Sequence, residues 1–122
     1  PTLDGGVELA STILLQGTRP DAVVCRNDLL AIGLINAAQS FGLRVPEDVA
    51  ITGCDNIPVA RYIQPSLTTL DMRCEEQGEI AMRRLLAAIL QKDSVEDIML
   101  EPRLIIGKSS GRPKAMESKI SL

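Results

Sequence analysis

Two short apolar stretches of the sequence are each followed by side chains that can hydrogen-bond a ligand. The stretch at 22–25 leads into Asn27, and the stretch at 49–52 leads into Asp55. Ligands of open parallel sheets bind outside the carboxyl ends of the strands, so Asn27 and Asp55 are expected at one rim. An amide both donates and accepts hydrogen bonds, whereas an ionised carboxylate only accepts them. The pair therefore suits a ligand that carries hydroxyl groups, such as a sugar or a nucleoside.

The same side chains have a purely structural interpretation. Asn27 or Asp28 can cap the helix that follows, and Asp55 can start a turn. The spacing does not decide between ligand binding and local structure for Asn27 and Asp55. For Asp28, which directly precedes an apolar helical stretch, capping is the favoured role.

The residue types exclude most enzyme chemistry. The chain has no His, so neither a His-ligated metal site nor a His-based catalytic triad can form. Its three cysteines are odd in number and lack C-x-x-C spacing, which is typical of reduced thiols. A Cys54 nucleophile would lack a His base, and a phosphate acceptor at Asp55 would lack an acidic cluster and an opposing Lys. We predict no enzyme activity, no metal and no other cofactor.

Composition also separates the chain from DNA-binding and membrane proteins. The formal net charge is −3 and no basic stripe is present, so the electrostatic footprint of a nucleic-acid binder is missing. Hydrophobic residues make up 45% of the 122 residues, but no apolar run is long enough to cross a bilayer. The start at Pro1 shows no secretion signal and no Met. These features predict a cytoplasmic location and a piece of a longer protein.

Hydrophobic periodicity predicts the α/β class. Strands that alternate with helices form βαβ units and a parallel sheet, and so few strands leave one sheet edge exposed. The first strand is wholly apolar, which is typical of a buried parallel strand. Asp4 is a possible N-cap of the first helix, and the polar chain from Lys108 onward is expected to be a loose tail. The predicted strands cover 22–25, 49–52, 67–72 and 98–106, and the predicted helices cover 6–16, 28–40 and 74–91.

The helix at 28–40 is apolar around most of its circumference. Such a helix is buried on more than one side, and only one side can rest on the sheet. The second partner is then a missing part of the chain, another subunit, or the remainder of a larger core. The helix at 74–91 is ordinarily amphipathic, and its charges predict a solvated face. Without the sheet that it covers, its apolar side would favour a homodimer or a larger oligomer.

Several motifs match one family in order and without large gaps. The sequence reads PDAV at 20–23, NDLLAIG at 27–33, GLRVPEDV at 42–49, GCDNIP at 53–58, PSLTT at 65–69 and PRLI at 102–105, followed by Ser109 and Ser110. Together these motifs resemble the C-terminal half of LacI/GalR transcription regulators. The resemblance covers nearly the whole chain up to Gly111. One position departs from the family, because Cys54 stands where an aromatic residue is usual.

The resemblance implies a partial periplasmic-binding-protein-like fold of type I, in which three crossovers join two α/β subdomains around an effector cleft. Asn27 and Asp55 match family positions that contact effector hydroxyls. The start of the helix after Asn27 and the loop 57–64 match the family's subunit interface. The residues implied at that interface are Leu29, Leu30, Ile32, Ile35, Ile57 and Tyr62.

The resemblance also implies a domain plan and a function. Residues 1–111 would be the C-terminal part of an effector-binding domain, with 69–97 in the other subdomain, and 112–122 would be a flexible tail. The chain would sense a sugar or nucleoside-like effector as a homodimer or larger oligomer, with no membrane partner. DNA would be bound only through an N-terminal helix-turn-helix that this sequence lacks. The alternative is the sugar-binding component of a transport system with the same fold, which the PSLTT motif disfavours.

Overall fold

A single sheet of four short strands organises the computed structural model, which describes residues 2–91 and 97–111. Strands β1, β2 and β3 are parallel neighbours, and β4 pairs antiparallel with β3. This arrangement confirms the predicted α/β class and the parallel pairing of β1, β2 and β3, whereas β4 departs from the predicted parallel sheet. In chain order the elements are α1 (Leu3–Leu14), β1 (Ala22–Val24), α2 (Asp28–Ser40), β2 (Ala50–Cys54), the 3-10 helix η1 (Pro58–Arg61), β3 (Thr68–Asp71), α3 (Cys74–Gln91) and β4 (Arg103–Ile105).

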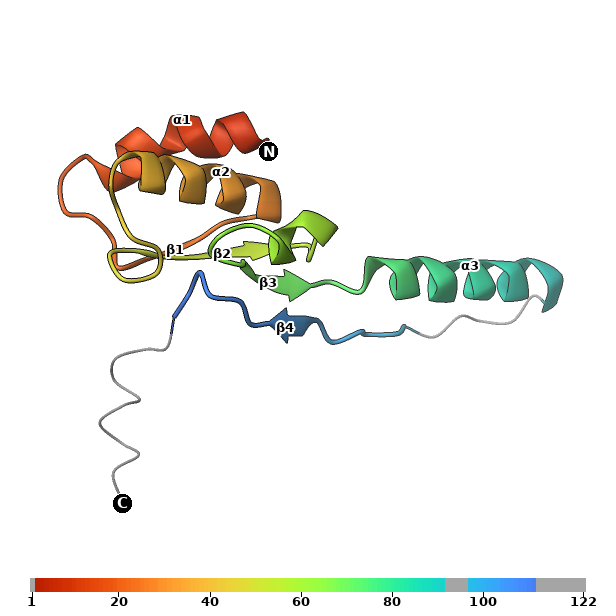
Figure 1. The fold of residues 1–122 in the computed structure, drawn as a ribbon. Helices are drawn as coiled ribbons and strands as arrows, with labels where there is room; N and C mark the ends of the chain where they lie inside the picture. The colour runs from red at the N-terminus through yellow and green to blue at the C-terminus, as the bar shows by residue number, and fades with distance from the viewer. Residues whose placement is uncertain (1, 92–96, 112–122) are drawn as a thin grey trace, which may run out of the picture.

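Helix α2 is the centre of the core. It packs against the sheet on one side and against α1 on the other, so that α1 forms an outer layer over α2 (Figure 1). Ile32 is 6% exposed and Ile35 is 1% exposed. Ile32 and Ile35, which the resemblance implied at a subunit interface, are therefore core residues. Of the alternatives that the apolar pattern left open for the second side of α2, the structure shows burial within the core of this chain. The missed partner is α1, which contributes Ala10 and Leu14 to the same core.

The helix caps differ in part from the expected ones. Thr2, rather than Asp4, caps α1, because its Oγ1 accepts a hydrogen bond from the Gly5 amide at 3.1 Å. Asn27 caps α2, and its Oδ1 accepts from the Leu30 amide at 2.9 Å. The capping role expected of Asp28 is therefore wrong, since its carboxylate bonds elsewhere.

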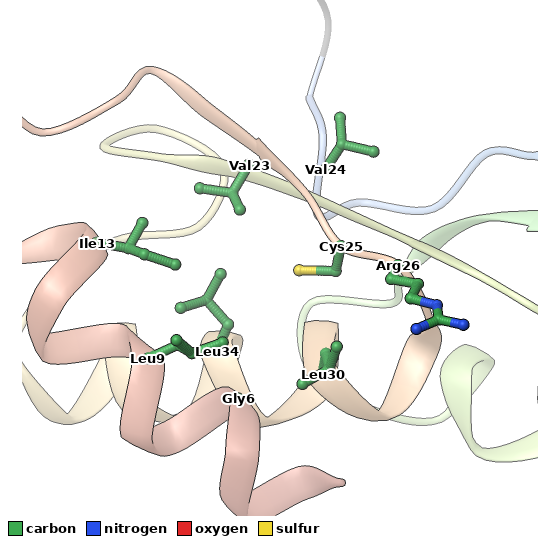
Figure 2. Close-up of a pocket in the computed structure, with 9 residues that line it drawn as sticks. All are labelled: Gly6, Leu9, Ile13, Val23, Val24, Cys25, Arg26, Leu30 and Leu34. Carbon is green, nitrogen blue, oxygen red and sulfur yellow. The ribbon is translucent and has the colours of Figure 1, made fainter. Parts of the chain in front are cut away.

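Strand β1 lies at an edge of the sheet, and within the described ranges no strand pairs with its outer side. Val24 is 83% exposed, so the expectation of a fully buried strand is wrong, whereas the expected exposed edge is confirmed. Figure 2 shows Val23 on the helix side of the strand and Val24 on the opposite side. Beside this edge a shallow apolar pocket lies between α1, α2 and β1, lined by residues such as Leu9 and Leu30.

The segment after β4 is tied into the sheet and is not a loose tail up to Gly111. Ser109 is fully buried, and its hydroxyl donates to the Ile51 carbonyl at 2.6 Å and accepts from the Thr68 amide at 2.9 Å. The Ile51 amide in turn donates to the Ser109 carbonyl at 2.9 Å. These bonds join β2 and β3 to the returning chain. The predicted tail at 112–122 falls outside the described residues.

Helix α3 extends past the sheet, and residues 98–100 lie beside its first half (Figure 1). Within the part of the chain that the structure describes, the apolar side of α3 is largely uncovered. The exposed large apolar residues of α3 are Met82, Leu85, Leu86, Ile89 and Leu90. In residues 2–91 and 97–111 no helix is both long and apolar enough to cross a bilayer.

Candidate functional site

The loops after β1 and β2 emerge at the same rim of the sheet. The two strands are parallel neighbours in register, with Val24 opposite Thr52, so Asn27 and Asp55 both follow carboxyl ends at this rim. Asp55 is exposed and Asn27 is half-buried. Asn27 uses its carbonyl oxygen as the α2 cap, and its amide nitrogen makes no hydrogen bond to the described part of the chain. That nitrogen remains as a donor for a ligand.

Asp55 and Asn56 adopt a backbone conformation that side chains rarely take. Their φ angles are 108° and 51°, in the region that favours glycine. A non-glycine residue there costs about 1–3 kcal/mol and persists only when its surroundings hold it, most often at functional sites. The Asp55 amide donates to the Leu70 carbonyl at 2.9 Å, which ties this strained residue to β3.

A buried carboxylate lies directly beneath this loop. Asp28 has no exposed surface, and its Oδ1 accepts from the Thr69 hydroxyl at 2.5 Å. Its Oδ2 accepts from the Ile57 amide at 2.8 Å. Burial raises the pKa of Asp28, and the hydrogen bonds from Thr69 and Ile57 act in the opposite direction. This network was not found from the sequence, because its partners lie 29 and 41 positions away from Asp28.

Gly53 makes room for this carboxylate. A Cβ atom at position 53 would lie 2.3 Å from Asp28 Oδ1 and 2.9 Å from Leu67 Cδ2. Since real Cβ atoms do not approach so closely, only glycine allows β2 to pass Asp28 at this point. The glycine before the Cys54–Asp55–Asn56 loop is thus a packing requirement of the buried network.

An open hollow of about 830 Å³ lies in front of the loop, between the rim and the start of α3. Asp55 lines it and Asn27 does not, so the structure brings only one of the two predicted ligand residues to this hollow. Its walls carry both signs of charge, and the sequence did not single out its arginines. Residues that line it include Asp55, Asn56, Arg61, Asp71, Arg73 and Arg103.

Arg73 closes one side of the hollow at the link between β3 and α3. Its guanidinium holds the Glu76 carboxylate, with the closest nitrogen–oxygen distance at 2.6 Å, and it reaches the Glu101 carbonyl at 3.3 Å. The Arg73 amide donates to Asp71 Oδ1 at 2.8 Å. The contact with Glu101 joins this link to the segment that leads into β4.

The cysteines near the site are not activated nucleophiles. Burial raises the pKa of Cys25 to about 11, and burial is also the main cause of the raised pKa of Cys54. Both thiols are therefore protonated near neutral pH, and a thiol is a far weaker nucleophile than a thiolate.

Comparison with known proteins decides the family. The model of the periplasmic binding protein-like domain matches residues 2–110. The chain belongs to this family. A solved member with a closely similar structure is a LacI-type transcription regulator from Bifidobacterium animalis subsp. lactis, with a TM-score of 0.82 and 36% identity. That match covers 91% of this chain and 40% of the regulator.

Relatives within the family place the chain in its LacI/GalR branch. It is 41% identical over 107 residues to the HTH-type transcriptional repressor PurR of Photorhabdus laumondii, a match that covers 87% of this chain and 31% of the repressor. A LacI family regulator from Enterococcus faecium, solved with bound ribose, has a TM-score of 0.82 and 31% identity over 93% of this chain and 42% of that one. The chain thus spans about a third of the length of the curated repressors it matches. These relatives are transcription regulators, which confirms the prediction of a non-enzymatic family.

The strained backbone of Asp55 should lower the stability of the folded chain. We expect Asp55→Gly to be more stable than Asp55→Ala by about 1 kcal/mol, because glycine adopts φ near 108° freely whereas alanine keeps the strained Cβ. Urea unfolding of both variants measures the difference. Equal stabilities would mean that the loop relaxes to an ordinary conformation in solution.

Proposed function

We propose that the chain is the effector-sensing part of a LacI-type transcription repressor that acts in the cytoplasm. The ligand is a sugar or a nucleoside-like molecule that hydrogen-bonds Asp55 in the hollow, and the Asn27 amide nitrogen, on the same rim but outside the hollow, supplies a donor. The observation that carries the proposal is the strained, exposed Asp55, which lines the hollow in front of the rim. Relatives with bound sugars support the ligand class, since one neighbour holds ribose and another is a complex of the regulator CelR with cellobiose.

The rest of the cleft is proposed to come from a second subdomain. In this plan residues 69–97 pass through a crossover and α3 joins that subdomain. The support is twofold: the apolar side of α3 is uncovered, and the match that includes 91% of this chain accounts for only 40% of the similar regulator. Ligand binding would then favour one relative closure of the two subdomains and shift the population of DNA-binding states. DNA contact itself would be made by a helix-turn-helix outside this chain, whose own net charge is −3.

The proposed dimer contact is narrower than the sequence implied. Of the six expected interface residues, Leu29 and Tyr62 are exposed, at 36% and 77%. Leu30 and Ile57 are half-buried, so they can contribute only partly. The proposed interface therefore centres on Leu29 and Tyr62, with Ile57 and Leu30 at its margin. The transport alternative is disfavoured, because the relative at 41% identity is a repressor.

The test is the effector response of a repressor that contains this sequence. Asp55→Ala removes an ionised hydrogen-bond acceptor worth about 1.5–3 kcal/mol, so effector affinity should fall about tenfold to a hundredfold. Operator affinity without effector should be unchanged. Ribose, cellobiose and a nucleoside are the first ligands to titrate, and operator release measures the response.

Asp21→Ala is the matched control. Asp21 is an exposed aspartate directly before β1, at the amino end of a strand that is parallel to β2, whereas Asp55 follows the carboxyl end of β2. Its loss should leave the response intact. An Asp55→Ala repressor that responds to its effector like the wild type would contradict the proposed site.

A further inference from the structure

The three amides that follow β2 are each held by a different acceptor. The Asp55 amide donates to the Leu70 carbonyl at 2.9 Å, and the Asn56 amide donates to Thr69 Oγ1 at 3.2 Å. The Ile57 amide donates to Asp28 Oδ2 at 2.8 Å. Two of these three acceptors are side chains, and both are buried.

The Thr69 hydroxyl has its direction fixed by Asp28. A hydroxyl carries one hydrogen and two acceptor lone pairs. Because the hydrogen is donated to Asp28 Oδ1 at 2.5 Å, the lone pairs of Thr69 Oγ1 are left to receive the Asn56 amide. Both Asp28 oxygens act as acceptors here, Oδ1 of the Thr69 hydroxyl and Oδ2 of the Ile57 amide. The two side chains therefore act as one unit.

We propose that Asp28 and Thr69 are positioning residues that hold Asp55 and Asn56 in their left-handed backbone conformation and so aim Asp55 at the ligand. The inference rests on the proposed function for the role of Asp55 and adds the residues that set its geometry. Asp28 is at the start of α2, Thr69 is on β3, and Asp55 is between them at the end of β2. Asp and Asn tolerate positive φ better than other non-glycine residues, and the buried acceptors fix the conformation that these two residues adopt.

A neighbouring threonine supplies a matched control. Thr68 is also on β3 and is also buried, but its hydroxyl faces the C-terminal segment. It accepts from the Gly107 amide at 2.9 Å and is 2.7 Å from the Ser110 hydroxyl. Thr68→Val and Thr69→Val thus make the same chemical change at adjacent positions. The first removes the acceptor of the Gly107 amide and the second removes the acceptor of the Asn56 amide.

The experiment is amide hydrogen exchange, followed by NMR on the full chain without ligand. Thr69→Val should speed exchange at Asn56 at least about tenfold, because the amide loses its acceptor, while exchange at Gly107 stays unchanged. Thr68→Val should show the reverse pattern. Thr69→Ser keeps the hydroxyl and should restore the slow exchange at Asn56. Asp28→Asn, which keeps one acceptor oxygen of the two, should speed exchange at Ile57 or Asn56.

The exchange rates distinguish a local effect at Asn56 from a general loss of stability. If Thr69→Val speeds exchange equally at Asn56, Gly107 and the strand amides, Thr69 is merely structural and the inference is overturned. If Asn56 exchange does not change in Thr69→Val, the loop is held by other means and the inference is also overturned. Neither result depends on a ligand, so the effector response of Asp55→Ala tests the proposed function independently.

Discussion

Ile35→Ala should lower the free energy of unfolding by about 2–5 kcal/mol, which is the usual cost of removing most of a buried Ile side chain. Ile35 is 1% exposed and belongs to the buried hydrophobic core. Small domains are stable by about 5–15 kcal/mol in total, so much of the chain should be unfolded at modest urea concentration. Ile35→Val should cost only about 0.5–1.5 kcal/mol. Urea unfolding followed by circular dichroism measures both.

Leu29→Ala distinguishes the core from the proposed interface on the same helix. Leu29 is 36% exposed, and substitutions at such positions usually change stability by about 0.5 kcal/mol or less. Its expected effect is on self-association, measured by sedimentation at micromolar concentration. If Ile35→Ala left stability unchanged but abolished association, Ile35 would be an interface residue rather than a core residue.

The order and type of the elements could be predicted from the sequence because each is encoded by local periodicity. The helix at 28–40 and the helix at 74–91 agree with the bounds of α2 and α3. The last strand was predicted too long, at 98–106, because apolar residues around Pro102 look extended whether or not they pair. Only Arg103–Ile105 has a partner in β3. Periodicity detects extended chain, but pairing depends on where a neighbour lies.

The packing of α1 on α2 could not be predicted from local periodicity. The all-round apolar pattern of α2 correctly showed that two faces are buried, but a pattern does not name the partner. The partner is α1, whose apolar residues were equally compatible with packing on a sheet. Glycine was the available signal: Gly6 and Gly33 meet where the two helices cross, at a separation that admits no side chain.

The candidate site was predicted in part for the same reason. Asn27 and Asp55 follow strands, so topology alone places them at one rim. The buried network of Asp28, Thr69 and the Ile57 amide joins residues that are far apart in the sequence, and nothing local marks it. Ser109 was missed likewise, since a serine near a polar terminus resembles a tail until its partners on β2 and β3 are known.

A side chain at Gly33 should destabilise the chain, because α1 and α2 cross closely there. A Cβ atom at Gly33 would lie 2.1 Å from the Leu3 carbonyl oxygen and 3.0 Å from its carbonyl carbon. These are backbone atoms at the start of α1, so the clash cannot be relieved by turning a side chain. We expect Gly33→Ala to destabilise the chain by about 1–3 kcal/mol or more and to loosen α1 from α2. Amide exchange in α1 should accelerate more than exchange in β2, because the covering helix opens first.

Gly78→Ala is the counterpart that isolates packing from helix propensity. Gly78 is also inside a helix, but a Cβ atom there would meet nothing within 4 Å. Alanine is favoured over glycine within helices by about 1 kcal/mol. Gly78→Ala should therefore raise the helicity of α3, and the urea midpoint of unfolding should not fall. At Gly33 the same propensity gain is opposed by the clash with Leu3, and the clash should prevail. If Gly33→Ala proved as stable as the wild type, α1 would not lie close against α2, and the apolar side of α2 would again need a partner from outside the chain.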